Sequence, residues 1–142
     1  ENILLVKPDD ITDLKLIDFG LSKCVEKAGT PINDLTEMNS KRGTAYYIAP
    51  EILYGYGYNS QCDMWSIGVC LYILLCGAPP FYGKDDNEVL HMIKTSTYDY
   101  QDIVFNYVSK EVKLLIDDLL CKDVEKRLDA KSALKCKWLK DC

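Results

Sequence analysis

The sequence has a single histidine, no pair of closely spaced cysteines, and no run of apolar residues long enough to cross a membrane. It holds one histidine and seven cysteines without a Cys-x-x-Cys pair, so neither a zinc site nor a disulfide framework is indicated. The most apolar run, "IGVCLYILLCG" at residues 67–77, is shorter than the ~20 residues that a transmembrane helix needs. We therefore expect reduced thiols in a cytoplasmic protein without a membrane span.

Positive charge is also in short supply. The chain carries 17 Lys and Arg residues against 22 Asp and Glu residues, and no basic stripe stands out, so we expect no nucleic-acid partner. Its 142 residues suit one domain or part of one, and a hydrophobic fraction of 48% is typical of a globular chain. The opening "ENILLVKP" is neither a targeting signal nor a natural start, so we expect the chain to begin inside a domain.

Apolar runs and turn residues predict an extended beginning and a helical remainder. Residues 3–6 and 14–17 are short apolar runs separated by "KPDDITD", whose Pro and Asp residues favour a turn, so we expect a small β-hairpin. Residues 21–42 are polar and broken by glycine and proline, which indicates a long loop. A helix can begin at Ser60 as its cap and end at Gly77, and its apolar composition on nearly every side predicts a central position.

Three more helices are predicted in the second half of the chain. Asp85 or Asp86, Ser109 and Asp129 each stand directly before a helical pattern and can cap it. The stretch after Ser109 places apolar residues at the i, i+3, i+4, i+7 and i+8 spacing of a helix with one buried face. The last helix is expected to run through "AKSALKCKWL". The fold class is therefore mainly α with a small β-hairpin.

An ordered series of short motifs follows the hairpin. Asp18-Phe19-Gly20 comes first, then "GTAYYIAPE" from residue 43, "DMWSIG" from residue 63 and "KR" at residue 126. With Glu1-Asn2 at the start, this series resembles the second half of a protein kinase catalytic domain. The stretches "DFGLSK", "GTAYYIAPEIL" and "EKRLDAKSAL" are similar to the corresponding sequences of calcium-dependent protein kinases, which belong to the calmodulin-kinase-related group.

The resemblance implies a domain layout and a reaction. Residues 1–142 would form a protein-kinase-like C-terminal lobe, truncated at its N-terminal side, with the hairpin at the active-site edge and an activation segment at residues 18–51. The parent protein would transfer the γ-phosphate of ATP to serine or threonine hydroxyls of proteins with Mg²⁺, under calcium control if a calcium-sensing domain follows downstream. The Gly-rich loop, the strand lysine and the His-Arg-Asp sequence with the catalytic aspartate are absent from the chain, so we expect the fragment alone to be inactive.

The resemblance assigns Mg²⁺ and ATP binding to Asp18 and Asn2. Phosphoryl transfer needs hard oxygen ligands for the metal, and a carboxylate and an amide at one end of a hairpin would supply them. Gly20 permits a sharp turn after Phe19, whose ring can pack inward and support Asp18. Taken alone, Asp18 could instead simply cap a turn, as Asp often does after a strand.

The remaining assignments concern the segment that docks substrate and its supports. Thr44 is expected to hydrogen-bond near the catalytic aspartate, and it favours a serine/threonine kinase over a tyrosine kinase. Glu51 and Arg127 are expected to form a largely buried ion pair, although arbitrary Glu and Arg residues are more often solvated surface charges. Asp63 and Trp65 lie in the first turns of the central helix. The resemblance implies that Asp63 braces the catalytic loop; alternatively, Asp63 is simply an acid that the helix dipole stabilises in the first turn.

Three residues of the long loop, Thr30, Thr36 and Ser40, are candidate phosphorylation sites. An alternative function is a non-catalytic kinase-like scaffold that binds peptides through residues 43–51 and the helix over residues 87–94. Because the helices that would cover the central helix are missing, we also expect the fragment to expose apolar surface and to self-associate.

Overall fold

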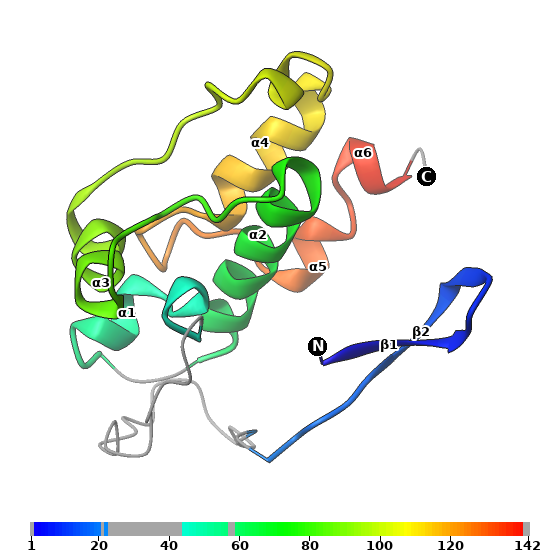
Figure 1. The fold of residues 1–142 in the computed structure, drawn as a ribbon, viewed down its shortest axis with the longest axis horizontal. Coiled ribbons are helices and arrows are strands. Elements are labelled where there is room, and N and C mark those ends of the chain that lie inside the picture. The colour runs from blue at the N-terminus through cyan, green and yellow to red at the C-terminus, as the bar shows by residue number, and fades with distance from the viewer. Residues whose placement is uncertain (1, 21, 23–43, 57–58, 141–142) are drawn as a thin grey trace.

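The computed structural model describes residues 2–20, 22, 44–56 and 59–140. In this part of the chain a two-stranded hairpin precedes a body built of helices (Figure 1). The mainly helical character with a small hairpin, expected from the sequence, is present.

The hairpin consists of β1 (Ile3–Lys7) and β2 (Asp10–Leu16), which pair in antiparallel fashion. Its existence is confirmed, and the turn at Pro8 and Asp9 lies within the predicted stretch, but β2 begins before the apolar run at residues 14–17. Lys7 pairs with Asp10 directly beside this turn, and the ladder is interrupted by an irregularity between Leu5 and Lys7. The acidic stretch after Asp9 therefore extends β2 rather than forming a loop.

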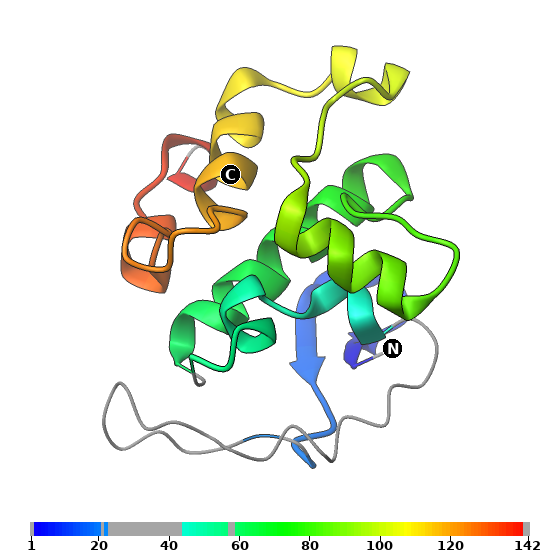
Figure 2. The ribbon, with the colours of Figure 1, turned by 90° about the vertical axis from the view of Figure 1, so that its left-hand side faces the viewer.

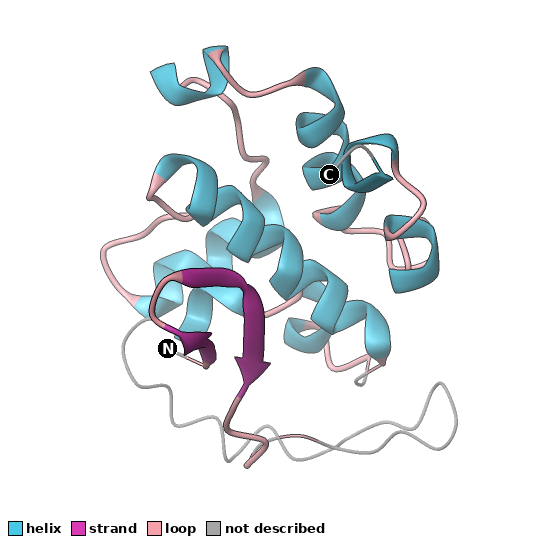
Figure 3. Cartoon of the chain, turned by 90° about the vertical axis from the view of Figure 1, so that its right-hand side faces the viewer, coloured by secondary structure: helices cyan, strands magenta, loops and turns pink. Residues whose placement is uncertain are grey.

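The hairpin stands apart from the helical body. Figure 1 shows it to one side of the helices, and Figure 3 shows the same hairpin from that side, in front of them. Its apolar side chains are exposed on both faces, with Ile11 at 78% and Leu16 at 66% of their accessible surface. A two-stranded hairpin is marginally stable by itself in water, so these strands have apolar area left for another surface to cover.

The helical body has six α-helices and two short 3₁₀ helices within the described residues. In chain order they are η1 (Thr44–Tyr47), α1 (Pro50–Leu53), α2 (Ser60–Cys76), α3 (Asp86–Thr95), η2 (Ile103–Asn106), α4 (Lys110–Leu119), α5 (Ala130–Ala133) and α6 (Lys137–Lys140).

Side-chain caps define where these helices begin. Asp85, Ser109 and Asp129 accept hydrogen bonds from backbone N–H groups in the first turns of α3, α4 and α5, as the sequence predicted. The expected cap Ser60 is wrong by one position, because the side chain of Asn59 accepts from the Gln61 N–H at 2.8 Å. Gly77 ends α2 with a φ of 77°, the left-handed conformation that favours glycine.

The predicted last helix is broken into α5 and α6. Ala133 and Trp138 both pack against the apolar cluster that contains Leu115 and Leu119 of α4. In one continuous helix, residues five positions apart point about 140° away from each other. The break between α5 and α6 lets both side chains reach the same surface, so tertiary packing overrides the local helical pattern.

The helix α2 runs through the middle of the helical body, and α4 packs along it (Figure 2). Their close approach depends on Gly68, where an added Cβ would lie 2.9 Å from the Cβ of Leu119. The central position predicted for α2 holds only in part, because Ile67 and Leu74 remain 50% and 83% exposed on one stripe of the helix. No described element covers that stripe.

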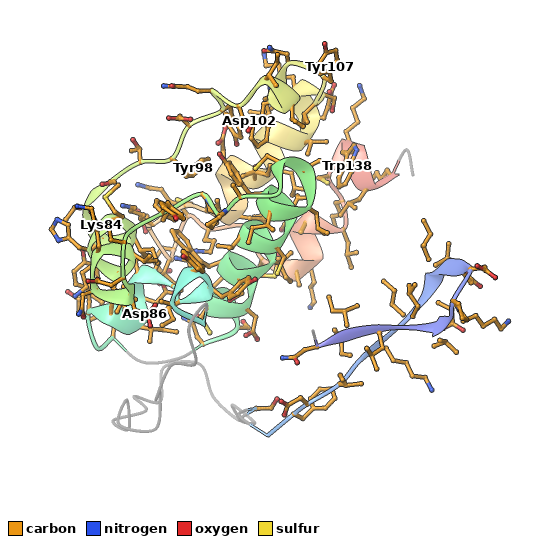
Figure 4. All side chains as sticks on the ribbon, in the orientation of Figure 1. Lys84, Asp86, Tyr98, Asp102, Tyr107 and Trp138 are labelled. Carbon is orange, nitrogen blue, oxygen red and sulfur yellow. The ribbon has the colours of Figure 1, made fainter. Side chains whose placement is uncertain are left out.

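Aromatic side chains join the loop after α3 to the body. The hydroxyls of Tyr98 and Tyr100 both donate to Oδ1 of Asp117 in α4, at 2.6 and 2.8 Å. Tyr98 lies between this loop and the helices (Figure 4), where its ring meets those of Tyr72 and Phe81 edge to face. Burial, followed by the hydrogen bond to Asp117, raises the pKa of Tyr98, so it stays a neutral donor.

Candidate functional site

Asn2 and Asp18 both lie at the open end of the hairpin. The last strand pair is Ile3 with Leu16, and the N–H of Ile17 donates to the backbone carbonyl of Asn2 at 2.9 Å. Asn2 therefore lies opposite Ile17, and Asp18 is the next residue along the chain. Both Asn2 and Asp18 are exposed. A carboxylate and an amide oxygen are thus exposed to solvent at the same end of the hairpin.

Asp18 has an unusual backbone conformation. Its φ is 63°, in the left-handed region that costs a residue with a Cβ about 1–2 kcal/mol. Its Oδ1 accepts a hydrogen bond from the N–H of Gly20 at 3.1 Å, which offsets part of that cost. A Cβ on Gly20 would lie 3.1 Å from the same oxygen, so the turn requires a small residue there. Asp18 therefore does shape a turn, and this turn sets the direction of its carboxylate.

The inward packing expected for Phe19 is wrong in this structure. Its ring is 67% exposed, because no described helix lies over this end of the hairpin. Phe19 therefore does not fix the position of Asp18 here, and the hydrogen bond from Gly20 does so instead.

The donor set at the hairpin end suits a hard cation. Asp18 and Asn2 offer oxygen ligands of the kind Mg²⁺ prefers, and Mg²⁺ is commonly held by one or two protein oxygens together with phosphates and water. Among the described residues, the hairpin end included, no group of three or more His, Cys, Asp or Glu side chains gathers at one point. The magnesium role that the resemblance gives to Asp18 and Asn2 therefore stays a prediction.

The segment after the long loop lies on α2. Thr44 begins η1, Ala45 and Ala49 are buried, and the hydroxyl of Ser66 donates to the carbonyl of Tyr47 at 2.9 Å. These contacts fix the backbone course from η1 to α1. The candidate phosphorylation sites Thr30, Thr36 and Ser40 lie outside the described residues.

An ion pair anchors the end of this segment. Glu51 of α1 and Arg127 are 4% and 3% exposed, and two parallel hydrogen bonds of 2.6 and 2.8 Å join the guanidinium to the carboxylate. The pairing predicted from the sequence is present, with the two-pronged geometry that gives the strongest charge-assisted bonds. Arg127 also donates to the carbonyls of Cys121 and Gln61 at 2.8 Å each, so its buried charge is well satisfied.

Trp65 lies beside this ion pair, whereas Asp63 faces solvent. Trp65 is completely buried, stacks on Phe81 with ring centroids 5.7 Å apart, and has the Arg127 guanidinium 5.1 Å from its ring centre. Asp63 is exposed in the first turn of α2, where a negative charge is favourable. Its role as a brace for the catalytic loop stays a prediction.

Sequence reasoning missed Gln61. Its side-chain amide donates to the carbonyl of Arg127 at 2.7 Å and to that of Val124 at 3.4 Å, across more than sixty residues. A single glutamine in the first turn of a helix carries no pattern that predicts such a contact. Only the fold places it beside the ion pair.

Comparisons with known proteins agree with the motif series. The protein kinase domain family matches residues 1–139. Calcium-dependent protein kinase 3 of Plasmodium berghei (strain Anka) is 43% identical over 141 residues, which cover 99% of this chain and 24% of that protein. Myosin light chain kinase A of Dictyostelium discoideum is 43% identical over 140 residues, covering 99% of this chain and 45% of that protein.

A plant protein shows the same degree of similarity. Calcium-dependent protein kinase 12 of Oryza sativa subsp. japonica is 40% identical over 141 residues, covering 99% of this chain and 25% of that protein. The chain thus spans about a quarter of the length of these calcium-dependent kinases and less than half of the myosin light chain kinase. No described helix is long and apolar enough to cross a membrane.

Proposed function

Since the chain belongs to the protein kinase family, we propose that it is the C-terminal lobe of a serine/threonine protein kinase whose remaining catalytic parts lie on a longer parent protein. The parent would transfer the γ-phosphate of ATP to hydroxyls of protein substrates. The observation that carries the proposal is the position of Asn2 and Asp18 on the two chain segments at one end of the hairpin. The chain alone, without the catalytic aspartate, would be inactive.

In this proposal the residues of this chain hold the Mg²⁺ ion and so position the phosphates of ATP. Bound Mg²⁺ would neutralise the phosphates of ATP, which is most of what phosphoryl transfer needs from an enzyme. Asp18 and Asn2 would hold the metal, and the bond from Gly20 would aim the Asp18 carboxylate. The exposure of both ligands leaves room for the nucleotide.

The substrate would dock on residues 43–51, at the end of an activation segment over residues 18–51. The bonds between Glu51 and Arg127 support this assignment, because they tie the end of the segment to the helical body. We assign Thr44 to the contact with the catalytic aspartate, which makes serine or threonine the expected acceptor. Phosphorylation in the long loop would add charge to the same segment.

The relatives and the cysteines support proposals on the regulation of the parent protein and on its cellular compartment. The relatives named calcium-dependent protein kinases suggest a calcium-sensing domain downstream in the parent. The five cysteines in the described part of the chain are free, which suits a reducing compartment, and we propose the cytoplasm.

The test is phosphotransfer by the full-length parent with Asp18→Ala. We expect a loss of at least about 100-fold, since the variant removes a ligand of the charge-neutralising metal. The matched control is Asp13→Ala, an exposed acid in β2 of the same hairpin, which should leave the rate unchanged. An unchanged rate in Asp18→Ala would refute the assignment. A parent that binds peptides without any phosphotransfer would favour the scaffold.

We also propose that the isolated chain self-associates. The exposed apolar residues on both faces of the hairpin and the stripe with Ile67 and Leu74 on α2 support this, because monomeric proteins rarely expose such continuous apolar area. Sedimentation should show a concentration-dependent increase in mass. A strictly monomeric profile at high concentration would contradict it.

A further inference from the structure

Gln61 and Arg127 exchange hydrogen bonds in both directions. The side-chain amide of Gln61 donates to the backbone carbonyl of Arg127 at 2.7 Å, and the guanidinium of Arg127 donates to the backbone carbonyl of Gln61 at 2.8 Å. Each residue thus binds the main chain of the other. The contact joins the first turn of α2 to the chain that follows α4.

This exchange sets the direction from which Arg127 reaches Glu51. The Gln61 amide also contacts the carbonyl of Val124 at 3.4 Å, so it holds the whole turn before Arg127 against α2. The planar guanidinium is pre-organised for two parallel hydrogen bonds, so it loses less freedom per bond once its backbone is held in place. The guanidinium therefore meets the Glu51 carboxylate with both N–H groups in line.

The orientation of the amide is well determined. Two carbonyls face its nitrogen, so the oxygen Oε1 must point the other way, and that oxygen is buried without a protein partner among the described residues. A buried acceptor without a partner costs stability, which an apolar side chain of the same shape would avoid. What the glutamine contributes that an apolar residue could not is the direction of its N–H groups.

We propose that Gln61 is a positioning residue for the substrate-docking segment. It holds Arg127 so that the guanidinium fixes Glu51, and Glu51 fixes the backbone that runs from η1 through α1. The inference rests on the proposed function for its link to substrate. The mechanical link from Gln61 to α1 can be measured separately.

The first experiment measures hydrogen exchange in the full-length parent with Gln61→Met, which keeps the length of the side chain and removes the amide. The amides of Ile52, Tyr54 and Tyr56 are bonded within or next to α1, and they report on this segment. We expect their exchange to accelerate at least about tenfold, while amides in α4 change less than about twofold. The matched control is Ser60→Ala, an exposed neighbour that should leave both regions unchanged.

Two outcomes would overturn the proposal. Equal acceleration in α1 and α4 would mean that Gln61 only stabilises the fold, and unchanged exchange in α1 would mean that it holds nothing there. If Gln61→Met does not fold, Gln61→Asn is measured by the same criterion, because its amide is too short to reach both carbonyls.

The second experiment connects the residue to substrate. In Gln61→Met we expect the KM for a peptide substrate to rise about tenfold, with the KM for ATP within about twofold of the original. A similar rise in both values would contradict a role in peptide docking. If the unaltered parent transfers no phosphate, the proposed function fails, whereas the contrast in exchange still decides whether Gln61 positions α1.

Discussion

Removing the charge of Glu51 should destabilise the chain far more than removing an exposed charge. In Glu51→Gln the side chain keeps its shape, but the Arg127 guanidinium loses its counterion while it stays 3% exposed. The bonds from Arg127 to the carbonyls of Cys121 and Gln61 remain and do not neutralise the charge. The variant therefore leaves a buried cation unpaired.

The size of the effect follows from this burial. Breaking a buried pair by removing one partner costs about 3–5 kcal/mol, out of a typical total of about 5–15 kcal/mol for a domain. With a urea m-value of about 2 kcal/mol/M, the unfolding midpoint should fall by about 1.5–2.5 M. The slope m should stay the same if only the stability of the folded state changes.

The assay is urea unfolding of the 142-residue chain followed by circular dichroism, with Lys126→Ala as the control. Lys126 pairs with Asp123 at 2.9 Å, but the two side chains are 78% and 46% exposed, and water and salt screen such pairs so that they contribute little to stability. The control midpoint should fall by less than about 0.5 M. If Glu51→Gln and Lys126→Ala shift the midpoint equally, the argument from burial is wrong.

Three further predictions concern local features. Asn59→Ala should lower the free energy of unfolding by about 1 kcal/mol and Ser60→Ala by almost nothing, because Asn59 is the cap of α2. Urea unfolding of the two variants measures this difference, and a larger loss in Ser60→Ala would show that Ser60 is the cap. Gly68→Ala should cost about 1–3 kcal/mol by pushing Leu119 of α4 away, and a thermal midpoint equal to that of the unaltered chain would show that the helices can separate freely. Burial, together with the charges of Asp63 and Glu51, raises the pKa of Cys62 from 9.0 to about 11. As the pH rises, the thiol therefore loses its proton in the unfolded state before it does so in the folded state. The free energy of unfolding should consequently fall as the pH rises from about 9 to about 11. The fall, followed by urea midpoints across that range, should be smaller in Cys62→Ala, and an identical fall would exclude Cys62 as its source.

Local chemistry in the sequence predicts the elements well. The hairpin, the start of the helices after Asp85 and Ser109, and the end of α2 at Gly77 each depend on a few neighbouring residues. Caps, turns and periodic apolar positions act over one or two turns of chain, so the sequence contains the information directly. The Asp18-Phe19-Gly20 series and the family likewise follow from the residues and their order.

The sequence by itself thus determined the family and the start of most helices, because motifs and caps can be recognised without coordinates. The pairing of Glu51 with Arg127 was predictable only through the resemblance to protein kinases, since charge alone does not select one pair among many acids and bases. Only the tertiary structure decided that Gln61 holds Arg127, that the last helix breaks, and that Phe19 stays exposed. Each of these depends on which surfaces meet after folding. Contacts between residues far apart in the chain are set by the packing of whole elements, and no local pattern carries that information.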